Sequence, residues 1–163
     1  MLKVILSGLC VLAAAAPLAA AVSPASIAGR WQGKSWAQQE QEGALTLDIV
    51  RCGEGWCGIT VAADNSCGAT ALKIGAGKTE PDSDYIVFEG SLQLAPKTEP
   101  YVVQVSIFEP DADEGPGKPL KLQITGDTGG QFRAYRRSFP YEAQLVRLQD
   151  ALCHAPQTVS SLR

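Results

Sequence analysis

The sequence contains a single histidine, His154, which directly follows Cys153 near the C-terminus. A triad of the Ser-His-Asp or Cys-His type needs a well-placed imidazole base, and a zinc site normally takes several histidines or cysteines. We therefore expect His154 to be a solvated neighbour of a disulfide. We also expect no catalytic residue, no metal site and no cofactor.

An excess of positive charge is lacking as well. The chain of 163 residues has 14 lysines and arginines against 17 aspartates and glutamates, and its net charge is −3. Nucleic-acid binders neutralise phosphates with clustered Lys and Arg, so we expect no nucleic-acid partner. After residue 22 no apolar run is long enough to cross a bilayer, so no transmembrane segment is expected there.

The first 21 residues have the pattern of a secretory signal peptide. Lys3 supplies the positive charge, residues 4–16 form an apolar run, and Ala19-Ala20-Ala21 fits the small-x-small cleavage rule. Cleavage at this point makes Val22 the new N-terminus. The pattern therefore predicts export to the periplasm or secretion from the cell.

A lipoprotein signal with Cys10 as its anchor fits less well, because the bulky Leu9 precedes that cysteine. We divide the remaining chain into a short tether at 22–26, a β-barrel domain at 27–150 and a C-terminal tail at 151–163.

Short segments with a period of two residues fill the barrel domain. Leu45, Leu47 and Ile49 alternate with Thr46 and Asp48, as expected for a strand with one buried face. No long stretch has the spacing of an amphipathic helix. Turn signals separate about eight strands, near 27–36, 43–51, 56–62, 68–75, 84–95, 100–109, 118–126 and 141–149, with 131–138 as a ninth short strand or a loop. This pattern predicts an all-β, antiparallel up-and-down barrel.

Four cysteines follow the predicted signal, and an even number in an exported chain indicates two disulfides. We expect Cys52 to pair with Cys57 across a four-residue hairpin loop, and Cys67 to pair with Cys153. A metal site that uses the Cys52-x4-Cys57 spacing is the less favoured alternative. In a simple meander the third hairpin and the C-terminal tail lie at opposite ends of the barrel. That arrangement favours a disulfide from Cys153 to Cys52 or Cys57, unless the loop around Asn65 folds back.

Two motifs carry a resemblance to known families. Gly29-Arg30-Trp31 opens the first strand, and a G-x-W motif there resembles the lipocalin and calycin barrels. The resemblance implies that Trp31 plugs one end of the barrel and that a basic residue of the last strand, here Arg147, lies across it. The run from Leu47 to Ile59 contains C-x4-C-G-x-I and resembles a family of small secreted bacterial proteins whose function is unknown. This second resemblance implies export and a calycin-like barrel, but no reaction.

Several other residues are candidates for binding or catalysis. Trp31, Trp36 and Trp56 are interpreted as core plugs, with ligand stacking as the alternative. Arg133, Arg136 and Arg137 form a basic cluster that is a possible anion contact, although arginine stems commonly cover apolar surface. The acidic loop with Glu109, Asp111, Asp113 and Glu114 resembles part of a calcium loop but lacks the bidentate glutamate at the usual spacing. Asp82 and Asp84 form a shorter copy of it. Glu40, Glu42 and Asp48 are candidates for a glycosidase carboxylate pair, although nothing in their spacing singles them out.

Two functions follow as hypotheses. The first is a non-catalytic barrel of the cell envelope that binds a small apolar ligand, a peptide or an envelope component. The alternative is a secreted protease inhibitor, in which the segment from Val22 to Ala28 would enter the protease cleft.

The signal peptide gives a direct test. N-terminal sequencing of the exported protein should begin at Val22 or within a few residues of it. A protein that retains Met1, or that carries lipid on Cys10, would contradict the predicted export route.

Overall fold

The computed structural model describes residues 23–37, 41–79, 85–108, 110, 118–127 and 141–155, with the backbone alone at 41 and 42. A short 3₁₀ helix precedes nine strands. The elements are η1 (Pro24–Ile27), β1 (Gly29–Ala37), β2 (Gln41–Cys52), β3 (Gly55–Val61), β4 (Cys67–Ile74), β5 (Lys78–Thr79), β6 (Tyr85–Leu92), β7 (Tyr101–Phe108), β8 (Lys121–Asp127) and β9 (Tyr141–Gln149).

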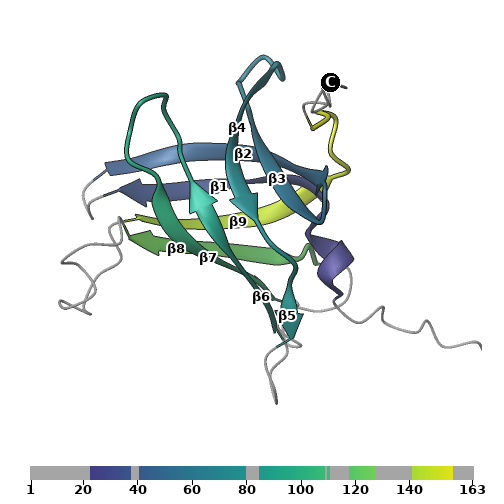
Figure 1. Cartoon of the computed structure of the whole chain (residues 1–163). Coiled ribbons are helices and arrows are strands. Elements are labelled where there is room, and N and C mark those ends of the chain that lie inside the picture. The colour runs from purple at the N-terminus through teal and green to yellow at the C-terminus, as the bar shows by residue number, and fades with distance from the viewer. Residues whose placement is uncertain are drawn as a thin grey trace, which may run out of the picture.

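The strands form one closed antiparallel barrel (Figure 1). Neighbours follow the order β4-β3-β2-β1-β9-β8-β7-β6, and pairing of β4 with β6 closes the sheet. The eight-stranded barrel predicted from the sequence is therefore confirmed. The two-residue strand β5, which pairs with β6, was not expected. The predicted alternative of a strand at 131–138 lies outside the described residues.

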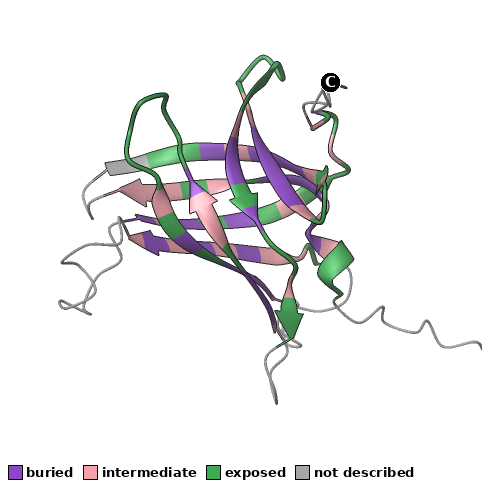
Figure 2. Cartoon of the chain, viewed as in Figure 1, coloured by how far each residue is buried: buried purple, intermediate pink, exposed green. Residues whose placement is uncertain are grey.

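The two-residue period has the expected physical cause. Along β8, buried and partly exposed residues alternate, and Leu122, Ile124 and Gly126 are the buried ones (Figure 2). Side chains of the same kind from the other strands fill the interior, including Leu47, Phe88 and Val105. No helix in the described part of the chain is long and apolar enough to cross a membrane.

Trp31 lies fully buried beside η1, at one end of the barrel. Its indole Nε1 donates a hydrogen bond to the carbonyl oxygen of Ile27 at 2.8 Å, and Ile27 is itself fully buried. The predicted tether at 22–26 therefore needs correction. Residues 24–26 belong to η1, because Ile27 contributes apolar surface to the core and holds this turn against the barrel.

Arg147 does not stack on Trp31 as the calycin resemblance implied. The two residues are opposite each other in the β1–β9 register. However, the guanidinium donates from Nε to the Ala28 carbonyl at 3.2 Å and from Nη2 to the Asp150 carboxylate at 2.7 Å. These partners draw the cation to the rim of the barrel. In the described part of the chain, the cation–π contact is formed by Trp56, with the Arg51 guanidinium 4.9 Å from its ring centroid.

The two disulfides join Cys52 to Cys57 and Cys67 to Cys153, which is the predicted pairing. The predicted four-residue loop is wrong. Cys52 is opposite Gly55 in the ladder, so the turn contains two residues, and its first position, Gly53, has a φ of 63° that favours glycine. Cys57 is opposite Val50, and the disulfide is therefore diagonal, with a Cα–Cα distance of 5.7 Å.

The different surroundings of Trp31 and Arg147 predict different effects on stability. Trp31→Ala should lower the free energy of unfolding by about 3–5 kcal/mol, because it removes a fully buried indole and leaves a cavity. Arg147→Ala should cost about 1 kcal/mol, since it loses a hydrogen bond and a solvent-screened ion pair. Urea denaturation of both variants measures the difference, and equal small losses would contradict the plug role of Trp31.

Candidate functional site

A cavity of about 700 Å³ opens at the end of the barrel beside η1. We call it the rim groove. Its lining combines apolar side chains with two arginines and one aspartate, and it contains no histidine or cysteine among the described residues. The lining residues are Ala25, Ser26, Ala28, Gly29, Ile49, Val50, Arg51, Trp56, Pro119, Leu120, Arg147, Asp150 and Ala151.

The alternation of the strands places the two arginines at the rim. Leu47 and Ile49 are buried on β2, and Arg51 follows two residues later on the same face. On β9, Leu145 is buried and Arg147 follows at the same spacing. Both arginines therefore end an inward-facing row at the point where the interior reaches solvent.

Arg51 and Trp56 form one side of the rim groove. They are opposite each other in the β2–β3 register, and the guanidinium lies over the indole ring. Trp56 is only 7% exposed, and its Nε1 is buried without a hydrogen-bond partner in the described part of the chain. Arg51 is exposed and has no hydrogen-bond or ion-pair partner among the described residues. Its donors are therefore available to a ligand.

Arg147 forms another part of the lining. Its bond to the Ala28 carbonyl fixes the position of the guanidinium relative to η1. Its other partner, Asp150, has a side chain that is 95% exposed, so this ion pair is formed in contact with water. The groove therefore presents cationic hydrogen-bond donors next to apolar side chains, and this combination can bind a ligand.

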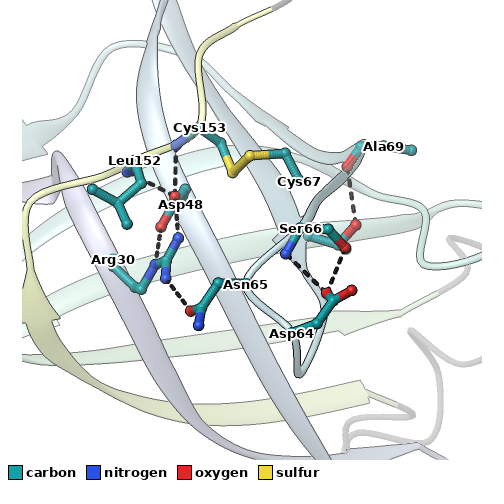
Figure 3. The surroundings of a disulfide bond; sticks show 10 residues. Arg30, Asp48, Asp64, Asn65, Ser66, Cys67, Ala69, Leu152 and Cys153 are labelled. Carbon is teal, nitrogen blue, oxygen red and sulfur yellow. Dashed lines mark hydrogen bonds and ion pairs between the residues drawn. A yellow bond between two sulfur atoms is a disulfide. The ribbon is translucent and has the colours of Figure 1, made fainter.

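A second polar cluster lies on the outer face of the barrel (Figure 3). Arg30 and Asp48 are opposite each other in the β1–β2 register, and both are buried, Asp48 completely. Arg30 donates to the Asp48 carboxylate from Nε at 2.7 Å and from Nη2 at 2.9 Å. Its Nη1 donates to the side-chain oxygen of Asn65 at 2.7 Å. We call this group, with Leu152 and Cys153, the outer cluster.

The C-terminal tail covers this ion pair. The backbone N–H groups of Leu152 and Cys153 each donate to Asp48 at 2.8 Å, and the disulfide to Cys67 holds the tail against the β3–β4 hairpin. Burial by itself would raise the pKa of Asp48. The hydrogen bonds from Arg30 and from the two N–H groups outweigh burial, and the pKa of Asp48 is lowered below its ordinary value.

The length of β3 explains how the β3–β4 turn reaches the tail. β3 pairs only with residues 47–52 of β2, so it ends beside Leu47, in the middle of that longer strand. The following turn folds back over the outer face, where Asn65, with a left-handed φ of 66°, accepts the hydrogen bond from Arg30. The objection to the Cys67–Cys153 pairing, that the two cysteines would lie at opposite ends, fails for this reason.

Asp48 was considered as a glycosidase carboxylate, and that alternative is wrong. A fully buried carboxylate that accepts four hydrogen bonds from the protein has no free surface for a substrate. Trp36 is partly exposed on β1, unlike the buried Trp31 and Trp56, so it is not a core plug. His154 is exposed in the tail.

Other candidates lie outside the described residues. These are the basic cluster of Arg133, Arg136 and Arg137, the acidic residues Glu109, Asp111, Asp113, Glu114, Asp82 and Asp84, Glu40, and the side chain of Glu42. Within the described ranges, no group of three or more His, Cys, Asp or Glu residues is arranged to hold a metal ion.

Sequence reasoning missed the position of Arg51 and the buried ion pair between Arg30 and Asp48. A signal was present, since Arg30 and Asp48 are charged residues at the outward positions of strands whose other face is apolar. Charged residues at outward positions are normal on strands that face water, so this pattern does not reveal that the tail buries Arg30 and Asp48.

Models of protein families, curated proteins and solved structures were compared with the chain, and none of them matches it.

The outer cluster predicts a specific loss of stability. Asp48→Asn should lower the free energy of unfolding by about 3–5 kcal/mol, because it leaves the Arg30 guanidinium buried without a counter-charge. The wild-type contribution should be complete above about pH 4 and should decline as the pH falls through the lowered pKa of Asp48, since protonation ends the ion pair.

Urea denaturation between neutral and acidic pH measures both effects. Asp64→Asn is the matched control, because Asp64 is an exposed aspartate in the neighbouring turn whose hydrogen bonds are to Ser66. If both variants lose equally little stability, the outer cluster does not stabilise the fold.

Proposed function

We propose that the protein is an exported, non-catalytic β-barrel of the cell envelope that binds a small ligand in the rim groove. The observation that carries this proposal is the composition of the groove. Ligand sites typically have volumes of about 300–1,000 Å³ and an apolar lining with a few convergent polar groups. A volume of about 700 Å³ with Trp56, Leu120 and two arginines fits that description.

The location in the envelope is supported by the cysteines. All four cysteines after the predicted signal form disulfides, and disulfides persist in oxidising compartments such as the periplasm and the extracellular space. Together with the signal-like residues 1–21, this favours export.

The structure gives the inhibitor alternative less support. Its candidate segment runs from Val22 to Ala28, and within it η1 packs on the barrel, with Ile27 fully buried. Residues 23–25 are exposed, but they belong to a turn that Ile27 anchors in the core and that lines the rim groove, whereas a segment that enters a protease cleft must extend away from the body of the protein. The binding function is therefore the better supported proposal.

Filling the groove tests the proposal. Ala25 is exposed and lines the groove, so Ala25→Trp should occupy it without disturbing the core. Ala95→Trp is the matched control, because Ala95 is exposed in the β6–β7 turn at the opposite end of the barrel. Native mass spectrometry of protein purified from the envelope should show a bound small molecule in wild type and Ala95→Trp, and its loss in Ala25→Trp. Empty wild-type protein, or a molecule retained by Ala25→Trp, would contradict the proposal.

A further inference from the structure

We infer that the ligand of the rim groove is an amphipathic molecule with an anionic head group, held by Arg51 and Arg147, and an apolar tail that lies along the groove. This inference rests on the proposed function and specifies the class of ligand. It follows from the charges of the lining, from the state of each arginine and from the surface between them.

The lining has an excess of positive charge in a chain whose net charge is negative. The chain carries a net charge of −3, yet the charged residues of the groove are two arginines and one aspartate. The excess cation is Arg51, whose guanidinium has no ion-pair partner among the described residues. A planar guanidinium matches the geometry of a carboxylate. We therefore expect the group that binds Arg51 to be an anion of the ligand.

Arg147 already binds a carboxylate. Its Nη2 is 2.7 Å from Oδ1 of Asp150, the side chain of which is almost fully exposed. An ion pair in contact with water contributes little free energy, so a ligand anion can replace or share this partner at small cost. The Nε bond to Ala28 keeps the guanidinium at the groove during that exchange.

The rest of the lining fits a tail and not a second head group. Accessible apolar surface comes from Pro119, Leu120, Ala25 and Ala28, with the edge of the mostly buried Trp56 beside them. The Trp56 ring is occupied by Arg51 on one face, and a cation bound over an indole remains able to donate hydrogen bonds at its edge. Apolar surface beside cationic donors therefore matches a molecule with one anionic end.

Three probes that each contain a ten-carbon chain test the charge of the head group. Decanoate is anionic, 1-decanoylglycerol is neutral and decyltrimethylammonium is cationic. Isothermal titration calorimetry with the exported, disulfide-bonded protein should show that decanoate binds at least about tenfold more tightly than the other two, the factor expected for one charge-assisted hydrogen bond.

Two substitutions then assign the effect to the groove. Arg51→Gln should weaken decanoate binding by about tenfold. Asp150→Asn should strengthen it by about two- to fivefold, because it removes the internal competitor for Arg147. Lys97→Gln is the control, since it removes one cation from the exposed β6–β7 turn at the other end of the barrel and should change nothing.

The outcomes separate this inference from the proposed function. Equal affinity for decanoate and 1-decanoylglycerol, with both lost in Ala25→Trp, would overturn the anionic head group and leave a ligand site in the groove. Tighter binding of decyltrimethylammonium, or weaker decanoate binding in Asp150→Asn, would also overturn it. Decanoate binding that survives in Ala25→Trp would overturn the assignment to the rim groove. The gain expected in Asp150→Asn cannot arise from a damaged fold, so it supports the inference even if Arg51→Gln is unstable.

Discussion

The buried ion pair between Arg30 and Asp48 is the constraint on which the surrounding structure depends. Both residues point outward from the barrel, where strands normally meet water. Once water is removed, the desolvation of two charges has to be offset by direct hydrogen bonds. The Asp48 carboxylate accepts two bonds from Arg30 and one each from the backbone N–H groups of Leu152 and Cys153. These bonds specify where the tail must lie.

The contacts around this ion pair form a closed circuit. The tail bonds to Asp48, the disulfide continues from Cys153 to Cys67, and the turn before Cys67 returns through Asn65 to Arg30 (Figure 3). Each contact restricts the positions available to the next. The Cys67–Cys153 ring joins residues 86 apart in sequence, so it also restricts the unfolded chain strongly.

The outer cluster also affects the rim groove, although the two lie on different surfaces of the barrel. Asp150 and Ala151 line the groove, and the next two residues, Leu152 and Cys153, are bonded to Asp48. Because these bonds hold Leu152 and Cys153 in place, they also restrict the positions of Asp150 and Ala151 in the wall of the groove. The position of Asp150 beside Arg147 thus follows from an ion pair on the outer face, which connects the stability of the fold to the shape of the proposed binding site.

The amino-acid sequence by itself determined the strands, the closed barrel and the number of disulfides. Burial on one face imposes a period of two that is visible at Leu45, Leu47 and Ile49, and the even number of cysteines after the signal-like segment predicted two disulfides. Tertiary structure alone decided the partners of Arg147, the burial of Asp48 and the position of Arg51 at the groove. These depend on contacts between distant segments: the tail bonds to Asp48 from above the outer face, and Arg147 donates to the carbonyl of Ala28, directly after η1. Local periodicity contains no information about such coverage, because a charged residue at an outward strand position has the same pattern whether water or another part of the chain lies above it.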